Sequence, residues 1–176
     1  LQVIRLAERD ASARAAAREM MERQLVHMVR LIDDLLDISR ISRNKMDLRR
    51  SRVMLADVID GALETARPAI EEAGHHLEVA LPPEPIPLDA DLTRLAQVFG
   101  NLLSNSAKYT PPGGRIWLAA ERRGDEVAVT IRDNGIGIPE SSLPAIFDMF
   151  PQVDRSIERA TGGLGIGLAL VKGLVE

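Results

Sequence analysis

Hydrophobic side chains in the first third of the chain recur at the spacing of one helix face. The repeat runs in steps of four and three residues, which is the period of an amphipathic helix. A lone helix cannot bury such a stripe, and the apolar segment 1–6 can pair with it as an antiparallel hairpin after a break near residues 10–13. Two hairpins would form a four-helix bundle, so we predict a homodimer, with a hairpin packed only on its own second domain as the alternative. The stripe comprises Met21, Leu25, Met28, Ile32 and Leu35, and it is widened by Leu31, Ile38 and Ile41.

The pattern changes near residues 49–53. Residues 1–52 contain no glycine or proline, whereas most of the 13 glycines lie at or beyond Gly100. We therefore predict a helical domain at 1–50 and a second domain at 51–176. The second domain mixes helical and strand-like segments, which predicts an α+β fold with helices on one face of a mostly antiparallel sheet. Its predicted elements are a helix at Leu55–Ala73, a strand at His76–Leu81, a helix from the N-cap Asp91 to about Tyr109, strands at Arg115–Arg122 and Glu126–Arg132 with a turn at Gly124-Asp125, a short helix at Pro139–Phe147, a loop at 148–163 and a last helix from about Leu164.

Composition narrows the classes of protein. The 176 residues carry 22 Lys+Arg and 26 Asp+Glu, for a net charge of −4, and 45% are hydrophobic, as in a folded globular protein. The absence of cysteine excludes disulfides, thiolate zinc sites and cysteine nucleophiles. No apolar run reaches the ~18 residues of a membrane span, so we expect a cytoplasmic segment without membrane contact. Residues 1–52 are mildly basic, but their charges alternate in sign, as at Arg18-Glu19 and Glu22-Arg23, so we expect no nucleic acid as partner.

One flank of the predicted helix at 92–109 carries polar side chains that suit a nucleotide. At 100° per residue, Asn101, Asn105, Lys108 and Tyr109 lie on that flank. Amide oxygens are hard ligands for Mg²⁺, an ammonium meets phosphate charge, and an aromatic ring can cover a base. Taken alone, the flank is more typical of a solvated surface whose lysine complements the helix dipole. The adjacent flank, which we predict to face the core, comprises Leu92, Leu95, Phe99, Leu102 and Ser106.

Two glycine-containing segments follow. Residues 133–138 (DNGIGI) come directly after a predicted strand, where the Asp133 carboxylate can accept a hydrogen bond from an adenine amino group and the glycines let backbone approach a ring. Residues 162–167 (GGLGIG) begin the last helix, where free backbone N–H groups suit phosphate. They match neither the dinucleotide-binding fingerprint, because Leu168 stands at its sixth position, nor the P-loop, because no Gly-Lys-Ser/Thr follows. Each segment alone is weak evidence, since Asp-Asn-Gly turns are common.

Taken in order, these motifs resemble the ATP-binding domain of sensor histidine kinases, in the superfamily shared with DNA gyrase and MutL. Residues 101–108 (NLLSNSAK) resemble the N box, 133–137 (DNGIG) the G1 box, 147–150 (FDMF) the F box and 163–167 (GLGIG) the G2 box. Residues 14–50 resemble the second helix of that family's dimerisation and histidine-phosphotransfer domain. The resemblance implies a helical hairpin, half of a dimeric four-helix bundle, followed by an α/β sandwich of the histidine kinase, gyrase and MutL type.

The resemblance also implies a role for each matching position. Asn105 is the expected Mg²⁺ ligand, and Asn101 and Lys108 are expected to act in catalysis near metal and phosphate. Tyr109 is expected against the adenine, and Asp133 on its amino group. The loop 148–163 is expected to close over ATP as a mobile lid. The glycine-rich segments that border the nucleotide contribute Gly135, Gly137, Gly163, Leu164, Gly165 and Gly167, and Arg155 or Arg159 of the lid is the candidate for contact with the γ-phosphate.

The implied activity is transfer of the γ-phosphoryl group of ATP to a histidine, and then to an aspartate on a response-regulator receiver domain. Catalysis of this kind rests on positioning and on charge neutralisation, here by Mg²⁺ and Lys108. The sequence does not identify the stimulus, the response regulator, transfer in cis or in trans within the dimer, or whether the parent protein is anchored in a membrane.

The acceptor histidine of the family is missing from its usual motif. No His-Glu/Asp-x-x-x-Pro box occurs, and His27 lies in the second helix in a segment that does not match the box. We interpret His27 as a structural histidine, and His75 and His76 as surface residues of a turn. We expect the acceptor to precede Leu1 and the chain to be a piece of a larger kinase, shortened at both ends, that binds Mg·ATP without phosphorylating itself.

Two other functions stay open. The first is an ATPase clamp of the gyrase and MutL type, in which nucleotide drives dimer closure, although such clamps lack the preceding hairpin at 14–50. The second is a non-catalytic dimerisation module with a vestigial nucleotide pocket, although every expected pocket position is filled.

Overall fold

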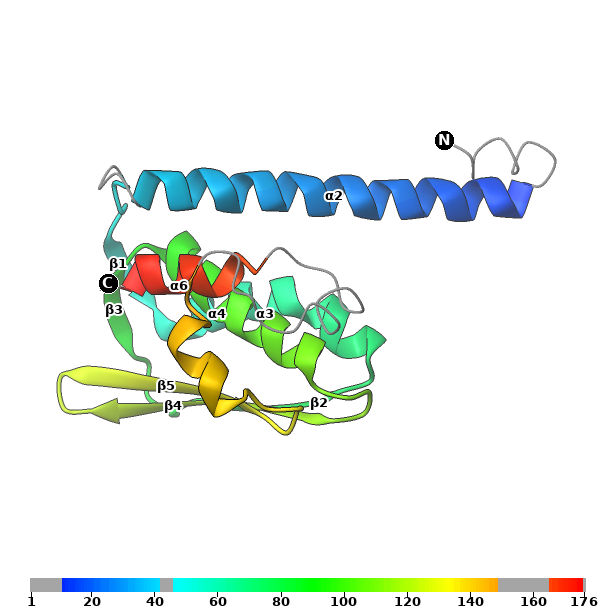
Figure 1. The fold of residues 1–176 in the computed structure, drawn as a ribbon. Helices are drawn as coiled ribbons and strands as arrows, with labels where there is room; N and C mark the ends of the chain where they lie inside the picture. The colour runs from blue at the N-terminus through cyan, green and yellow to red at the C-terminus, as the bar shows by residue number, and fades with distance from the viewer. Residues whose placement is uncertain (1–10, 42–45, 149–164, 176) are drawn as a thin grey trace.

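The computed structural model describes residues 11–41, 46–148 and 165–175. Helix α2 (Ala11–Ile41) is 31 residues long, lies alongside the rest of the molecule and projects beyond it at its N-terminal end (Figure 1). The residues on the N-terminal side of the break predicted near 10–13 lie outside the described residues, so the break stays a prediction. The predicted partner segment 1–6 lies outside the described residues, so the hairpin stays a prediction.

The other elements form an α+β domain, as predicted. Its main sheet has three strands in the order β2 (His76–Ala80), β4 (Arg115–Arg123) and β5 (Glu126–Asp133). Strands β4 and β5 form the predicted antiparallel hairpin, which turns at Gly124 with a φ of 65°. Strand β2 runs parallel to β4. The sheet is therefore mixed, and the prediction of a mostly antiparallel sheet is only half right.

A second sheet, which the sequence pattern does not predict, holds the start of the domain. Strands β1 (Ser51–Met54) and β3 (Pro87–Ala90) pair antiparallel, with Val53 opposite Leu88. Four residues are too few for a clear alternation of apolar and polar positions. The linker after α2 leads into β1. Pairing with β3 therefore holds the end of this linker beside the segment that precedes α4.

Helix α4 (Leu92–Tyr109) follows its predicted bounds. At its N-terminus, Oδ1 of Asp91 accepts a hydrogen bond from the backbone N–H of Arg94 at 3.2 Å, which is a standard side-chain cap. The other carboxylate oxygen accepts from the backbone N–H of Arg49 at 2.9 Å. The helix ends before Pro111, which has no N–H to continue it.

The remaining helices are close to prediction. Helix α3 (Leu55–Glu72) matches the predicted helix to one residue. The predicted short helix after β5 is a 3₁₀ helix, η2 (Glu140–Ala145). The last helix, α6 (Gly167–Val175), begins later than the predicted Leu164, which lies outside the described residues.

The core lies between the main sheet and helices α3 and α4, which cover one face of the sheet (Figure 1). Leu103 is the deepest side chain of α4 at 0% exposed, whereas Leu92, predicted to face the core, is 39% exposed. Leu95, Phe99 and Leu102 are only partly buried. The predicted core flank is thus wrong in part, because packing against α3 selects a neighbouring strip of the helix. The core comprises Leu55, Ile59, Ala62, Leu63, Ala66, Ile70, Leu103, Ala107, Ile116 and Leu118.

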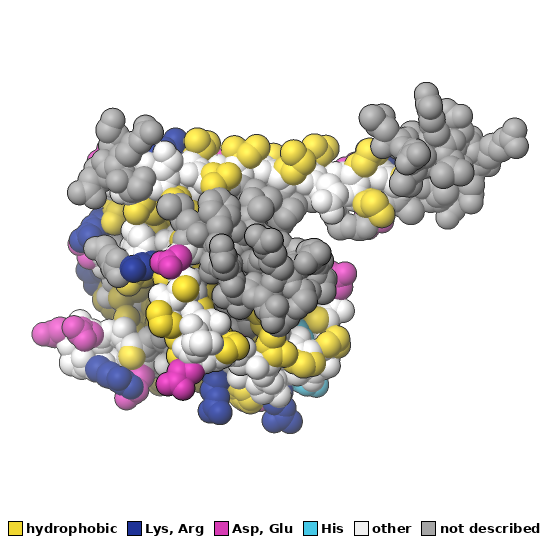
Figure 2. Space-filling model, in the orientation of Figure 1, with side chains coloured by type: hydrophobic (Ala, Val, Ile, Leu, Met, Phe, Trp, Pro, Cys, Tyr) yellow, Lys and Arg dark blue, Asp and Glu magenta, His cyan; other side chains and the backbone are white. Residues whose placement is uncertain are grey.

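The hydrophobic stripe of α2 divides into two parts. At its C-terminal end Ile38 is buried with Ile166 and Leu170, and Ile41 lies against Gly173 of α6. Met21, Leu25, Met28, Ile32 and Leu35 of the stripe are exposed, and Figure 2 shows hydrophobic side chains along the face of α2 that points away from the domain. Among the described residues, the contacts of α2 with the second domain lie in its last two turns. The large hydrophobic side chains exposed on α2 are Met20, Met21, Leu25, Met28, Val29, Ile32, Leu35 and Leu36.

A buried ion pair fixes where α2 sits on the domain. Asp37 is 5% exposed, and both of its carboxylate oxygens accept hydrogen bonds from the guanidinium of Arg94 on α4. Gln97 joins them, since its Oε1 accepts from Arg94 at 2.8 Å and its Nε2 donates to Asp34 at 3.3 Å. These contacts of Asp34 and Asp37 with Arg94 and Gln97 form the junction between α2 and α4. A buried charge is tolerated only when it is paired, so the junction specifies the position of α2.

Replacing Arg94 with methionine should detach α2 from the domain. The change leaves the buried Asp37 carboxylate without its partner, which costs about 3–5 kcal/mol in comparable pairs. Backbone amides of α6 should then exchange with solvent faster, because α2 no longer covers Leu170, and hydrogen-exchange mass spectrometry measures this.

The matched control is Arg67→Met. Its ion pair with Glu71, at 3.9 Å, is largely exposed and contributes little. Equal exchange of α6 in the Arg94 variant and the control would contradict the assigned role of the junction.

Candidate functional site

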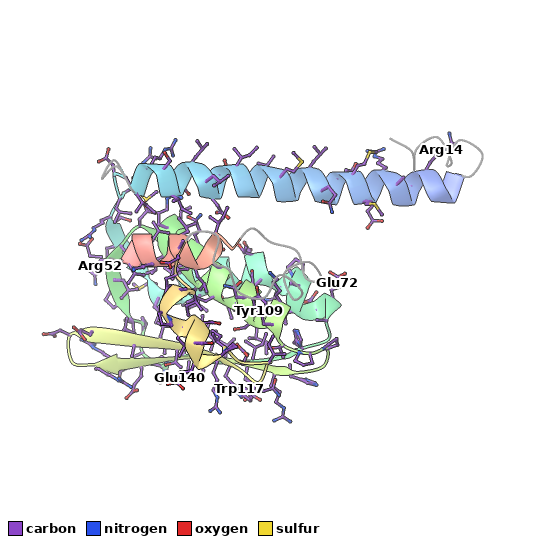
Figure 3. All side chains as sticks on the ribbon, viewed as in Figure 1. Arg14, Arg52, Glu72, Tyr109, Trp117 and Glu140 are labelled. Carbon is purple, nitrogen blue, oxygen red and sulfur yellow. The ribbon has the colours of Figure 1, made fainter. Side chains whose placement is uncertain are left out.

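Helix α4 presents its four polar candidates on one half-buried flank. Asn101, Asn105, Lys108 and Tyr109 are all intermediate in exposure. Figure 3 shows Tyr109 on the helix side of the main sheet and Trp117 on the other side. The ammonium of Lys108 lies 4.7 Å from the centroid of the Tyr109 ring. Within the described part of the chain no carboxylate pairs with Lys108, so its charge is available to a ligand.

The start of α6 lies against Asn101. A Cβ added to Gly167 would lie 3.5 Å from Oδ1 of Asn101, so the glycine faces the amide with room for about one methyl group between them. Gly165, just before the helix, has a φ of 67°, which only glycine adopts at little cost. The first N–H groups of a helix have no partner inside the helix, and the start of α6 brings such groups beside Asn101 on the polar flank of α4, the amide flank.

Asn101 also carries a polar atom without a partner. Its Nδ2 is buried and makes no hydrogen bond to the described residues. A buried amide nitrogen without a partner costs free energy unless a ligand or water accepts its hydrogen bonds. Together with the N–H groups of α6, this donor suits an anionic ligand.

The turn at residues 133–138, the Asp133 turn, follows β5 and is held against the C-terminal end of α4. Oδ2 of Asp133 accepts from the Ser106 hydroxyl at 3.0 Å, and Oδ1 accepts from the backbone N–H of Gly135 at 2.9 Å. The carboxylate is thereby fixed at the end of β5, and each of its oxygens can still accept one more hydrogen bond. The sequence pattern assigns Ser106 only to the core. Its hydroxyl nevertheless helps the Gly135 N–H to orient the Asp133 carboxylate.

Gly135 lies where a side chain does not fit. A Cβ there would lie 2.8 Å from Oδ1 of Asp133 and closer still to the backbone carbonyl of Tyr109. The next residue, Ile136, donates its N–H to that carbonyl at 3.1 Å. Gly137 has a φ of 70° and open space around it. The Asp133 turn and the end of α4 are therefore one continuous surface.

Two buried residues near this surface are absent from the candidates that the sequence suggests. The hydroxyl of Thr110 is buried without a hydrogen bond among the described residues. His75, interpreted above as a surface residue, is 8% exposed and contacts the end of α4, so that interpretation is wrong; His76 is exposed. Neither residue has a local sequence signal, because each acquires its surroundings from segments distant in the chain.

Several candidates lie outside the described residues: Phe150, Arg155, Arg159, Gly163, Leu164 and the predicted lid. His27 lies in α2, but its side chain is also outside them. Phe147 is described and is 41% exposed.

Within the described ranges no group of His, Asp and Glu side chains could hold a metal ion. No helix of these ranges is long and apolar enough to cross a membrane.

Gly135→Ala should destabilise the protein by about 1–3 kcal/mol, which is typical of forcing an atom into a filled space. The added methyl would collide with the Tyr109 carbonyl and push the Asp133 turn away from α4. Urea unfolding measures the change. Gly173→Ala tests the same effect away from the site, because its methyl would meet the deformable side chain of Ile41 at 2.7 Å and should cost less. An equal or larger cost at Gly173 would contradict the close fit assigned to Gly135.

Known proteins match this architecture. A family model described as histidine kinase-, DNA gyrase B-, and HSP90-like ATPase matches residues 90–176. The chain is 40% identical over 152 residues to the circadian input-output histidine kinase CikA of Synechococcus elongatus. This match covers 85% of this chain and 20% of that protein. The solved mycobacterial sensor histidine kinase MprB is 30% identical, with a TM-score of 0.60, over 72% of this chain and 78% of that one. Full-length ShkA in complex with AMPPNP has a TM-score of 0.74 at 27% identity, over 93% of this chain and 34% of that one.

These matches include all three parts of the site. The ATPase family model begins just before α4 and continues through the Asp133 turn and α6. The match to ShkA extends over α2 as well, since it covers 93% of the chain. The chain spans 18% to 25% of the length of the curated relatives that it matches. On the sequence and structural match to MprB, the chain belongs to the sensor histidine kinases and is a histidine kinase catalytic core.

Proposed function

We propose that this chain binds Mg·ATP between the amide flank of α4, the Asp133 turn and the start of α6. The observation that carries the proposal is the joining of these three parts along one helix. Gly167 faces Asn101 in the middle of the helix, and Ser106 holds Asp133 near its C-terminal end. The solved ShkA neighbour was captured with AMPPNP, an ATP analogue, which supports the same ligand class here.

The adenine end of the proposed site is the Asp133 turn. The carboxylate has one free acceptor position on each oxygen, and an exocyclic amino group is a complementary donor. The ring of Tyr109, half-buried beside this turn, offers an apolar surface to the base. Guanine presents a carbonyl where adenine presents the amino group, so the carboxylate also discriminates against it.

The phosphate end is proposed at Asn101, Lys108 and the start of α6. The donors that anionic oxygens require are the amide nitrogen of Asn101, which has no partner among the described residues, and the ammonium of Lys108, which pairs with no carboxylate of those residues. Asn105, one helical turn from Asn101, is proposed as the protein ligand of Mg²⁺, because a half-buried amide oxygen suits a hard cation that keeps phosphate and water ligands. When bound, the metal neutralises charge on the transferred group.

In the intact protein we propose transfer of the γ-phosphoryl group to a histidine nitrogen, with ADP leaving, and onward transfer to a response-regulator aspartate. This chain has no histidine in an acceptor motif, so we propose that it does not phosphorylate itself. The exposed stripe of α2 supports a homodimer built through helices, because a face of this length needs a partner.

The two rival functions receive less support. A gyrase-like clamp has no use for a helix such as α2, whose described contacts with the domain lie in its last two turns. A vestigial pocket is at odds with the presence of Asn101, Asn105, Lys108 and Asp133 together on one surface. Mg·ATP binding without phosphotransfer by the full-length protein would nevertheless favour the clamp.

Asp133→Asn should weaken Mg·ATP binding by about tenfold to a hundredfold, since a hydrogen bond to a charged group contributes about 1.5–3 kcal/mol. The amide keeps the size of the carboxylate, but its NH₂ group repels an adenine amino group. Discrimination between ATP and GTP should shrink as well, and isothermal titration calorimetry measures both. Asp125→Asn in the β4–β5 turn is the control, and unchanged ATP affinity in the Asp133 variant would contradict the adenine assignment.

Asn105→Ala should lower ATP affinity only when Mg²⁺ is present. Loss of a metal ligand removes an interaction that exists only in the metal complex. We expect about a tenfold loss with Mg²⁺ and less than about twofold with EDTA, on the scale of one charge-assisted contact. Ser104→Ala, one residue away and about 100° round the same helix, controls for general effects on α4. Equal losses with and without Mg²⁺ would rule out Asn105 as the ligand.

A further inference from the structure

The last turn of α4 cannot satisfy its own carbonyl groups. In an α-helix each carbonyl accepts from the N–H four residues later. For Ala107 that donor would belong to Pro111, which has no N–H. The carbonyl of Ser106 does receive its regular bond, from Thr110 at 3.1 Å. The carbonyl of Ala107 therefore needs a donor from outside the helix.

His75 supplies that donor. Its Nε2 lies 2.9 Å from the carbonyl oxygen of Ala107, and the contact is buried. A carbonyl only accepts, so Nε2 is the donor in this contact. The imidazole thus replaces the N–H that Pro111 lacks.

The backbone holds the imidazole in place from both sides. The His75 N–H donates to Ile70 at 2.9 Å, which closes the turn after α3, where Gly74 has a φ of 64°. Two further bonds join this turn to the one after α4: Gly113 donates to Ala73 and His76 donates to Gly114, each at 2.9 Å. The ring therefore has little freedom to leave the Ala107 carbonyl.

Packing alone does not account for a histidine here. Nδ1 of His75 is buried and has no hydrogen-bond partner among the described residues, which costs free energy that an aliphatic side chain of similar size would avoid. The one interaction that an aliphatic side chain could not make is the donation from Nε2. That donation is therefore the chemical reason for the residue.

The carbonyl that His75 caps directly precedes the site residues. Ala107 is followed by Lys108 and Tyr109, and the carbonyl of Tyr109 is in turn held by the N–H of Ile136 in the Asp133 turn. The two side chains proposed to meet phosphate and base thus lie between two capped carbonyls. One cap comes from the α3–β2 turn and the other from the Asp133 turn.

We propose that His75 is a positioning residue for nucleotide binding, which acts by capping Ala107 and so fixing the direction of Lys108 and Tyr109. This role rests on the proposed function, because it has a purpose only if those two side chains contact the nucleotide. It touches no nucleotide itself.

The test compares His75→Leu with His75→Gln in the whole chain. Leucine removes the donor, whereas the amide of glutamine reaches about as far as Nε2 and can still donate to Ala107. We expect His75→Leu to weaken Mg·ATP binding about fivefold to twentyfold in calorimetry, the range of one lost buried hydrogen bond, and His75→Gln to stay within about threefold. His76→Leu, at the exposed neighbour, should leave binding unchanged.

Two readouts separate positioning from general stability. Exchange of the Ile136 and Thr110 amides should speed up in His75→Leu but not in His75→Gln, while the β4–β5 hairpin keeps its exchange rates. In a Lys108→Ala, Tyr109→Leu background, His75→Leu should cost less than about twofold in affinity, because the residues that it positions are gone.

Each outcome decides the matter. Full additivity in that background, or equal losses with leucine and glutamine, would overturn the positioning role. If the parent chain itself fails to bind Mg·ATP, the proposed function fails; the amide exchange still shows whether His75 caps α4, but the positioning role then falls with the function.

Discussion

Helix α4 has to bury one strip of its surface in the core and offer the next strip to a ligand, and the rest of the site depends on how that division is enforced. Leu103 and Ala107 lie in the core with α3 and the main sheet, while Asn101, Asn105 and Lys108 remain half-buried beside them. A rotation of the helix by one residue would carry the amides into the core or the leucines into the site. The core therefore sets the direction of the site residues.

Contacts at both ends of α4 prevent that rotation. The Asp91 cap and the Asp37–Arg94 pair hold the first turns, and the His75 and Ile136 caps hold the last one. Between them, Gly167 of α6 faces Asn101, with room for about one methyl group between them. The long helix α2 contacts α4 directly through Asp37 and Arg94, and it also contacts α6 through Ile38. The helical segment is therefore linked to the candidate site by two physical routes.

The sequence predicts best what is decided locally. The cap at Asp91, the stop before Pro111 and the glycine turn of the β4–β5 hairpin are short-range features, and the structure has all three.

The strands β1 and β3 are not predicted, because their pairing is long-range and each is only four residues long. The sequence pattern assigns the core strip of α4 wrongly in part, because the helix has two adjoining apolar strips. Packing against α3 decides which of them is buried. His75 is missed because its partner, Ala107, is 32 residues away. For the site, spacing and motif order predict candidate residues, but not the hydrogen bond by which Ser106 orients Asp133.

The most direct measurement is a crystal structure of the chain with Mg²⁺ and a non-hydrolysable ATP analogue. We expect the adenine amino group within hydrogen-bonding distance of Asp133 and the phosphates beside Asn101, Lys108 and the start of α6. We also expect an unchanged contact between His75 and the Ala107 carbonyl. A nucleotide bound elsewhere, or one that leaves Asp133 and Asn101 untouched, would show that the three elements do not form a nucleotide site.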